Sequence, residues 1–241
     1  MSGRLDVAAA AALGVTRSKA ADMIARGLVT VGGVAVTKPS FPAPDGADIA
    51  ADLSGEYVGR GGLKLAAALD YFRIDLTGAV CLDVGASTGG FTDCMLRRGA
   101  SSVLAVDNGR GQLAVSLAAD PRVTNMEGVN ITGLSPRDMP EGLSFAAADV
   151  SFVSLASLMP SVAEFLPARC RFVFLVKPQF ELSRGEVGRG VVRSEKARLR
   201  AVARVRSAAE TRGLTVAGVI PSPITGGGGN IEYLIHGGRF G

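Results

Sequence analysis

The chain has 241 residues, of which 47% are apolar, and a net charge of +4, so it can bury a sizeable core and bind a polyanionic partner. One histidine and three cysteines exclude a histidine-rich metal centre and a disulfide framework, and we expect no bound metal. No segment approaches the roughly 18 consecutive apolar residues that cross a bilayer, so we expect a soluble, cytoplasmic protein without membrane contacts.

Residues 1–51 are predicted to form a small α+β domain that begins with two helices. The helices are expected over residues 5–13 and 18–26. Ser18 is expected to cap the second helix, and Gly27 to end it in the left-handed conformation.

A β-hairpin is predicted to follow the second helix. Its strands are expected over residues 28–31 and 34–37, joined by Gly32-Gly33, a pair that readily adopts the positive φ angles of a two-residue turn. Residues 52–58 are predicted to be a linker to the rest of the chain.

Short segments of this stretch carry a family pattern. They are Arg4-Leu-Asp6, Thr16-Arg-Ser18, Ala21, the run at 24–29, Val31-Gly-Gly33 and Lys38-Pro39. The pattern resembles the alpha-L RNA-binding domain of a small-subunit ribosomal protein, pseudouridine synthases and some tRNA synthetases. The resemblance implies phosphate contacts for five basic residues, namely Arg4, Arg17, Lys19, Arg26 and Lys38. The alternative is ordinary surface charge, because residues 1–58 carry five Lys/Arg against six Asp/Glu.

From residue 59 to residue 241, predicted strands and helices alternate. This alternation predicts an α/β domain with a Rossmann-like, mostly parallel sheet, the architecture of class I methyltransferases. The seven strands are expected over residues 80–84, 102–106, 123–127, 145–148, 172–176, 215–221 and 232–236.

A glycine turn follows the first of these strands, in the segment Asp83-Val-Gly-Ala-Ser-Thr-Gly89-Gly90. It has neither the G-x-G-x-x-G spacing of hydride-transfer cofactor sites nor the Gly-Lys-Ser/Thr of a P-loop. A carboxylate facing the turn suits a ligand with a cationic end, and S-adenosylmethionine fits. We expect Gly85, Ser87 and Gly89 to line the cofactor site and Asp83 to orient the turn or meet the methionine ammonium.

Two further cofactor contacts are expected at later strand ends. Asp107 ends the second strand, where a carboxylate accepts hydrogen bonds from ribose hydroxyls. Asn130 follows the third strand and is placed to meet the adenine edge.

Strand ends four and five supply the candidate chemistry. They carry Asp149 and Lys177, and the fold should bring Lys64 and Glu232 to the same place. Neither the Asn/Asp-Pro-Pro-aromatic segment of base-amine methylation nor the Pro-Cys nucleophile of carbon-5 methylation is present.

Two lysines and two carboxylates suit methylation of a ribose 2′-hydroxyl, which must lose its proton as it attacks. A lysine serves as base in its neutral form, which burial or a neighbouring cation favours. We assign Lys177 as the base and Lys64 as its positively charged helper. Asp149 and Glu232 are expected to orient the amines, with Asp149 also beside the cofactor.

This set resembles that of FtsJ/RrmJ-type ribose 2′-O-methyltransferases, and its combination with an alpha-L domain resembles the TlyA family of haemolysin-named rRNA methyltransferases. Supporting segments are Gly59-Arg-Gly-Gly-Leu-Lys64, Asp83 to Thr92, Gly111-Gln-Leu-Ala114, Asp149-Val-Ser-Phe-Val-Ser154, Leu175 to Glu181, and Ser222-Pro with Gly229-Asn-Ile-Glu232. The resemblance implies cytidine 2′-O-methylation of 23S rRNA, in some members also of 16S rRNA, within an assembled ribosomal subunit.

Further RNA contacts are expected near the catalytic residues. Phe152 is placed to stack a flipped-out nucleotide, with packing in the core as the alternative. Arg184 and Arg189 lie in a glycine-rich loop, and a helix starting near Ser194 carries further bases, which either follow an RNA backbone or form a solvated face.

Two other function classes stay open at this point. One is an RNA-binding ribosome-assembly factor with a catalytically weak methyltransferase fold, and the other is a membrane-lytic protein. No feature of the sequence requires a second copy, so a monomer is expected.

Overall fold

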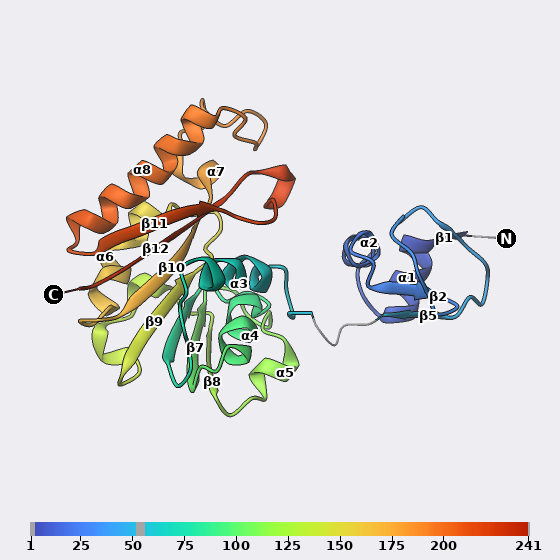
Figure 1. The fold of residues 1–241 in the computed structure, drawn as a ribbon, viewed down its shortest axis with the longest axis horizontal. Coiled ribbons are helices and arrows are strands. Elements are labelled where there is room, and N and C mark those ends of the chain that lie inside the picture. The colour runs from blue at the N-terminus through green and yellow to red at the C-terminus, as the bar shows by residue number, and fades with distance from the viewer. Residues whose placement is uncertain (1–2, 52–55, 241) are drawn as a thin grey trace. The chain divides into compact units, whose positions relative to one another are not determined.

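The computed structural model describes residues 3–51 and 56–240 (Figure 1). The chain divides into two units, Met1–Glu56 and Tyr57–Gly241. Of the predicted linker, residues 52–55 lie outside the described residues. Glu56 forms an ion pair with Arg26 of the first unit, and the Val58 N–H donates to Asp93 of the second unit at 2.9 Å.

The first unit is a small α+β domain. Its elements are β1 (Gly3–Arg4), α1 (Leu5–Leu13), α2 (Arg17–Ala25), β2 (Val29–Val31), β3 (Val34–Ala35), β4 (Pro42–Ala43) and β5 (Ile49–Ala51). Strand β2 lies between β3 and β5 in an antiparallel sheet, and β1 pairs with β4. The predicted hairpin is confirmed, because Val31 pairs with Val34 and both Gly32 and Gly33 have positive φ.

Helix α2 begins one residue earlier than the sequence pattern predicted. Thr16 has extended backbone angles, and its side-chain oxygen accepts a hydrogen bond from the Lys19 N–H at 3.3 Å. The predicted cap at Ser18 is therefore wrong, since Ser18 lies inside the first helical turn. The predicted stop is confirmed, because Gly27 has a φ of +74°.

The second unit carries the large sheet. Its helices are α3 (Gly61–Tyr71), α4 (Gly90–Arg97), α5 (Val115–Ala118), α6 (Leu155–Phe165), α7 (Pro178–Glu181) and α8 (Glu195–Thr211), with 3-10 turns η1 (Ile131–Gly133), η2 (Pro136–Asp138) and η3 (Gly227–Gly229). Its strands are β6 (Val80–Val84), β7 (Ser102–Asp107), β8 (Val123–Glu127), β9 (Leu143–Ala148), β10 (Arg171–Val176), β11 (Thr215–Pro221) and β12 (Tyr233–Gly238).

The strand order is β11-β12-β10-β9-β6-β7-β8. Strand β12 is antiparallel to both of its neighbours, and the pairs from β10 to β8 are parallel. The predicted Rossmann-like, mostly parallel sheet of seven strands is thus confirmed, and each predicted strand overlaps an observed one.

Helices cover both faces of this sheet, and the apolar side chains of the strands alternate between the faces (Figure 1). On one face Leu82 and Phe172 pack with residues of α6 and α8. On the other face Cys81 and Phe145 pack with residues of α3 and α4. Across the described residues, no helix combines the length and apolar character needed to cross a membrane.

The chain order reverses between β6 and β9, and this switch point fixes where a ligand can bind. The Asp149 N–H donates to the Val84 carbonyl at 2.9 Å, and the Gly85 N–H donates to Val106 at 2.8 Å. Gly85 has a φ of +82°, and a Cβ added there would lie 2.8 Å from the carbonyl oxygen of Asp149. Only glycine fits this turn without a backbone shift.

We therefore expect Gly85→Ala to lower the free energy of unfolding by about 2–4 kcal/mol, from the left-handed conformation and the backbone clash together. Gly78→Ala is the matched control, because Gly78 has a φ of +73° but open space around its Cβ position. Chemical denaturation of both variants measures the difference. Equal losses would show that the contact with Asp149 costs nothing.

Candidate active site

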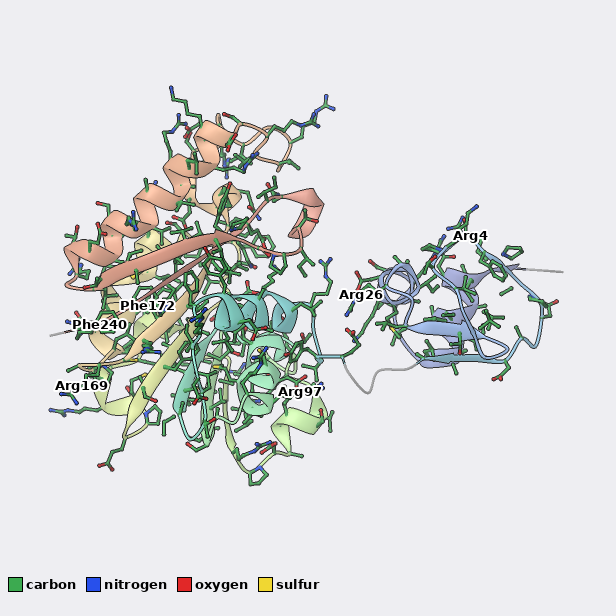
Figure 2. The ribbon with its side chains drawn as sticks, in the orientation of Figure 1. Arg4, Arg26, Arg97, Arg169, Phe172 and Phe240 are labelled. Atoms are coloured by element: carbon green, nitrogen blue, oxygen red, sulfur yellow. The ribbon has the colours of Figure 1, made fainter. Side chains whose placement is uncertain are left out.

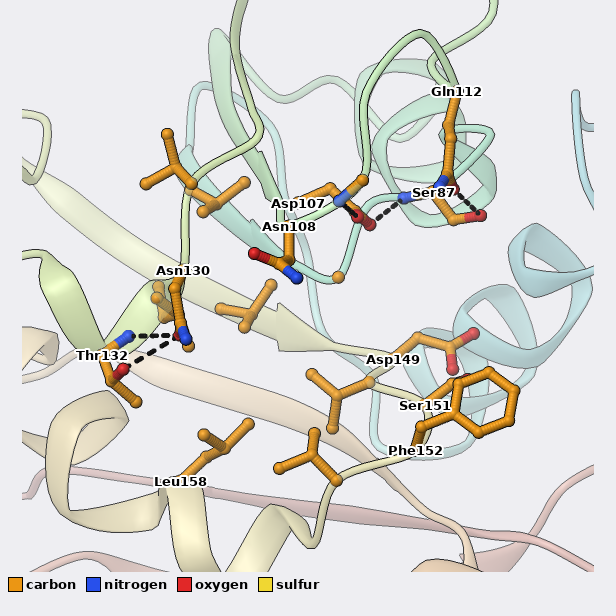
Figure 3. A pocket seen from close by; sticks show the side chains of 18 residues that line it. Ser87, Asp107, Asn108, Gln112, Asn130, Thr132, Asp149, Ser151, Phe152 and Leu158 are labelled. Carbon is orange, nitrogen blue, oxygen red and sulfur yellow. Dashed lines mark hydrogen bonds between the residues drawn. The ribbon is translucent and has the colours of Figure 1, made fainter.

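A cavity of about 740 Å³ opens at the carboxyl ends of β6, β7 and β9 (Figure 3). Its size lies within the range of about 300–1,000 Å³ typical of small-molecule sites. Four of the predicted cofactor residues line it on the cofactor side, namely Gly85, Ser87, Asp107 and Asn130. Asp149 and Phe152 line the same cavity. The residues predicted to bind the methyl donor and those predicted to meet the methyl acceptor therefore lie next to each other.

Asp107 is held by the turn that follows β6. Its carboxylate accepts from the Ser87 N–H and from the Gly109 N–H, each at 2.7 Å (Figure 3). Ser87 has a φ of 49°, and its hydroxyl donates to Gln112 at 3.2 Å. A carboxylate fixed in this way keeps lone pairs for the two hydroxyls of a ribose.

Asn130 performs a structural task as well as lining the cavity. Its Oδ1 accepts from the Thr132 N–H at 3.1 Å and from the Thr132 hydroxyl at 2.9 Å, which caps η1 (Figure 3). This leaves the Nδ2 group as the donor that Asn130 can offer to a ligand.

Glu127, at the end of β8, was not predicted. Its carboxylate accepts from three successive backbone N–H groups, at Gly111, Gln112 and Leu113, over 2.7–2.9 Å. These bonds lower the pKa of Glu127 and shape the loop that brings Gln112 to the cavity. The signal in the sequence was an acid at a strand end, the same signal that identified Asp107.

Asp83 lies beneath the glycine turn and is fully buried, but it is not one of the cavity-lining residues. Its Oδ2 accepts from the Thr92 hydroxyl at 2.6 Å, whereas Oδ1 has no hydrogen-bond partner among the described residues. Burial raises the pKa of Asp83 to about 7, against the opposing effect of the bond from Thr92. A buried acceptor without a donor suits a cationic ligand group.

Gly89 has a packing role. Its φ is +95°, and a Cβ would lie 2.3 Å from Leu117 Cδ1 and 2.8 Å from Leu113 Cδ1. It does not line the cavity, unlike Gly85 and Ser87. The glycine at this position thus lets α4 begin against α5 and its preceding loop.

The four predicted catalytic residues form two lysine–carboxylate pairs. Lys64 Nζ donates to Glu232 Oε2 at 2.6 Å, and both side chains are buried. Lys177 Nζ lies 2.6 Å from Asp149 Oδ1 and donates to the Ser151 hydroxyl at 2.6 Å. Each lysine is therefore matched by its own carboxylate, which fixes both amines in place.

The start of α3 brings the two pairs to one place. A Cβ at Gly61 would lie 3.6 Å from Asp149 Oδ2. Lys64 is three residues further along α3 and so faces the same side of that helix. One helix face thus presents its backbone to Asp149 and its lysine to Glu232.

Phe152 stands out at the rim of the cavity. It is 92% exposed and has a φ of 65°, which is unusual for an aromatic residue. Its ring centroid lies 5.3 Å from that of Phe180, the third residue of α7. The alternative of core packing is therefore wrong, because exposure leaves the ring free to contact a ligand.

Besides Glu127, the sequence analysis missed three residues on the other side of this site. Ser151 and Phe180 contact the predicted residues Lys177 and Phe152. The buried Glu181 accepts from the Ser154 hydroxyl at 2.7 Å and the Leu155 N–H at 2.6 Å. These bonds tie the segment after β9 to the segment after β10.

The five basic residues predicted to contact phosphates differ in whether they pair with carboxylates of the protein itself. Arg4 and Arg17 both bind the buried Asp6, with Arg4 bonding both carboxylate oxygens at 3.0 Å. The bonds from Arg4, with those from Arg17, lower the pKa of Asp6 to about 2. Arg26 pairs with Asp22 as well as Glu56, and lies apart from Arg4 on the unit (Figure 2). The remaining two predicted bases, Lys19 and Lys38, are exposed.

The basic region of the second unit is partly neutralised. Arg184 and Arg189 are exposed on the loop before α8. Along α8, Arg200 pairs with Glu186, and Arg204 donates to the Glu181 carbonyl at 3.0 Å. The loop therefore offers freer cations than the helix face does.

Taken together, the sheet order, the cavity at its switch point and the lysine–carboxylate pairs at the adjoining strand ends define a class I methyltransferase. The described residues hold no cluster of His, Cys, Asp or Glu that could bind a metal ion. The FtsJ-like methyltransferase model matches residues 57–239, and the S4 domain model matches residues 3–49. The chain belongs to the FtsJ-like methyltransferases and, with its S4 domain, to their TlyA group.

Individual relatives share both units. Over 91% of its length, the chain is 41% identical to the 16S/23S rRNA (cytidine-2'-O)-methyltransferase TlyA of Mycobacterium tuberculosis, covering 83% of that protein. It is 39% identical to Hemolysin A of Brachyspira hyodysenteriae, covering 92% of this chain and 93% of the relative. A solved Streptococcus thermophilus protein that carries a hemolysin name superposes with a TM-score of 0.78 at 41% identity, over 99% of this chain and 89% of the other.

The raised pKa of Asp83 predicts a pH-dependent affinity for S-adenosylmethionine. Ionised Asp83 attracts the methionine ammonium, so affinity should be high above pH 7 and fall by up to about tenfold per unit as Asp83 protonates below pH 7. Titration calorimetry from pH 5.5 to 7.5 measures this dependence. Asp83→Asn should bind weakly with little pH dependence, and an equally flat wild-type profile would contradict the role of Asp83.

Proposed function

We propose that this protein transfers the methyl group of S-adenosylmethionine to the 2′-hydroxyl of a cytidine in ribosomal RNA. The observation that carries the proposal is the pair of lysine–carboxylate contacts beside the cavity, Lys177–Asp149 and Lys64–Glu232. The 41% identity to a relative named for this reaction supports it. Both 16S and 23S rRNA are candidate substrates, since that relative is named for both.

The residues around the cavity fit the cofactor. Asp107 offers a fixed carboxylate for the ribose, Asn130 an amide for the adenine edge, and Asp83 a buried acceptor for the ammonium. When bound, S-adenosylmethionine supplies a methyl group activated by a positive sulfur. A neutral lining would hold such a ligand less well than these carboxylates do.

Lys177 is the proposed base. Asp149 Oδ1 and the Ser151 hydroxyl, which belong to cavity-lining residues, each lie 2.6 Å from its amine. In its neutral form the amine accepts the proton of the attacking 2′-hydroxyl, which lets a poorly acidic alcohol act as nucleophile. Lys64, whose amine is held by Glu232 at 2.6 Å, is the proposed helper that orients the ribose.

The RNA is held by surfaces of both units. Phe152 offers a face for a nucleotide turned out of its helix, because a 2′-hydroxyl within a duplex is hard to align with the donor. Arg184 and Arg189 offer charges for the backbone near the site. The S4 domain provides a second contact, through Arg4, Arg17, Lys19, Arg26 and Lys38. We propose that the protein acts as a monomer on an assembled ribosomal subunit in the cytoplasm.

The competing function is an assembly factor that binds ribosomal RNA without efficient transfer. Incubation of the protein with labelled S-adenosylmethionine and each ribosomal subunit, from cells that lack the enzyme, separates the two functions. Label in RNA that maps to the 2′-hydroxyl of a cytidine supports the proposal. Binding of a subunit without label would favour the assembly factor.

Lys177→Met should lower methyl transfer by about 10²–10⁴-fold, the usual contribution of a general base, while leaving cofactor affinity near wild type. Methionine keeps the length of the side chain but cannot accept a proton. Arg137→Met, an exposed cation on η2, is the control and should transfer normally. Transfer by Lys177→Met at the wild-type rate would remove Lys177 from the mechanism.

Phe152→Ala should lower the affinity for the RNA by about 1–3 kcal/mol, the value of one base–aromatic stack, without reducing protein stability. Phe152→Tyr should preserve activity, because the ring is retained. Tyr71→Ala is a control, since Tyr71 is also an exposed aromatic residue, at 69%. Filter binding and single-turnover transfer measure the effect, and equal behaviour of Phe152→Ala and Tyr71→Ala would contradict a stacking role.

A further inference from the structure

Two loops of the second unit meet at one buried amide. The first is the loop before α8, which carries Arg184 and Arg189. The second joins β11 to β12 and ends at Glu232 (Figure 1). The side chain that joins them is Asn230, which is only 3% exposed and which the chemistry proposed above does not use.

Asn230 bonds both loops through its side chain. Its Oδ1 accepts from the Val192 N–H at 3.0 Å. Its Nδ2 donates to the Gly190 carbonyl at 2.9 Å and to the Gly227 carbonyl at 3.0 Å. A carboxamide is the side chain that can donate and accept at once, and all of these bonds use that capacity.

The loop held by Asn230 has a defined shape. Gly188 and Val191 form a β-bridge, so the turn between them is closed, and Arg189 has a φ of 48° at its tip. Asn230 bonds Gly190, which lies inside this closed turn, and Val192, which directly follows it. The position of Arg189 thus depends directly on Asn230.

A second contact joins the same two segments. Arg198 of α8 donates to the carbonyls of Val192 and Arg193, at 3.3 and 2.8 Å, and to the Tyr233 hydroxyl at 3.3 Å. Tyr233 directly follows Glu232. The two loops are therefore tied on both sides of the catalytic carboxylate.

On its other side, Asn230 closes the turn that encloses Glu232. The Gly226 N–H donates to the Asn230 carbonyl at 2.8 Å, and the Ser222 N–H donates to the Glu232 carbonyl at 2.8 Å. A Cβ at Gly226 would lie 1.9 Å from Glu232 Oε1, so this turn packs directly against the carboxylate that binds Lys64.

We propose that Asn230 is a positioning residue that holds the Arg189 turn and the Lys64–Glu232 pair in one fixed arrangement, so that RNA backbone bound at Arg189 is held in register with the reacting ribose. The inference rests on the proposed function, which gives Arg189 and Glu232 their roles. The tie, meaning the hydrogen bonds by which Asn230 connects the two loops, can be tested without that function. Asn230 does not touch the reacting atoms. Its effect passes through the backbone of Gly190 and the carboxylate of Glu232.

The tie is tested first without substrate. Asn230→Ala loses three hydrogen bonds, so the loop should open more often and trypsin should cut after Arg184 and Arg189 about tenfold faster or more. Gly227→Ala is the matched control from the same turn, because its Cβ position is open and its φ is ordinary. It should be cut at the wild-type rate.

Coupling to catalysis is tested next, with the same full-length variants and ribosomal subunits. Asn230→Ala should lower kcat about tenfold while KM for S-adenosylmethionine stays unchanged. Arg189→Ala should cost much less activity in the Asn230→Ala background than in the wild type, because the two act as one unit. A purely structural role would give additive losses and a changed cofactor KM.

The outcomes are separable. Unchanged trypsin cutting of Asn230→Ala overturns the tie. Faster cutting with wild-type kcat, or additive losses with Arg189→Ala, overturns the positioning role. If the wild type transfers no methyl group to RNA, the proposed function fails, yet the cutting result still decides the tie. Should Asn230→Ala not fold, Asn230→Ser, which keeps one donor near Gly227, answers the same questions.

Discussion

The turn after β6 passes so close to the end of β9 that the carbonyl of Asp149 occupies the space where Gly85 would carry a side chain. Several features of the second unit depend on this contact. It keeps the ends of two parallel strands together at the point where the chain order reverses, and thereby opens the cavity between them. It also places Asp149, a partner of Lys177, next to the turn expected to hold the cofactor. The donor and acceptor halves of the site are adjacent because two backbones touch.

Around this contact, the charged side chains of the site occur as lysine–carboxylate pairs. Lys64 and Lys177 each have one carboxylate partner, and the pairs are held by α3 and by the ends of β9 and β10. Paired charges at low exposure contribute little net stability, but they permit few alternative arrangements. This suits a site whose task is to hold an amine within reach of a hydroxyl. Further from the pairs, Glu181 accepts hydrogen bonds from a hydroxyl and a backbone N–H, and the amide of Asn230 bonds two loops.

The sequence predicted the parts of the molecule that local pattern controls. The strands of the second unit were located because buried parallel strands alternate with helices and because the last two strands form an antiparallel hairpin. Asp107, Asp149 and Lys177 could be proposed as site residues because functional side chains collect at carboxyl strand ends. The cap of α2 was misplaced by two residues, since Ser18 and Thr16 are chemically equivalent candidates. The sequence placed Gly89 in the cofactor site, whereas in the structure its left-handed backbone packs against leucines that lie far along the chain.

What could not be predicted depends on contacts between distant segments. Glu181 bonds Leu155 across 26 positions, and Asn230 bonds Val192 across 38, and neither pairing leaves a local trace. The exposure of Phe152 was undecided because an aromatic residue after a strand can point either way. The pairing of Arg4 with Asp6 was within reach of the sequence, but the burial of Asp6, which makes one acid serve two arginines, was not.

The shared carboxylate of Asp6 has a consequence for how the S4 domain meets a polyanion. Each phosphate contact releases condensed counterions in proportion to the free positive charge that replaces them. Arg4 and Arg17 both form ion pairs with Asp6, whose pKa is lowered to about 2, so its carboxylate is ionised at neutral pH. The three side chains together therefore carry a single net positive charge. The salt dependence of binding by this domain therefore reports fewer ionic contacts than its count of arginines. For the proposed contact with RNA, Arg4 and Arg17 supply two guanidinium groups whose relative geometry is fixed by one carboxylate.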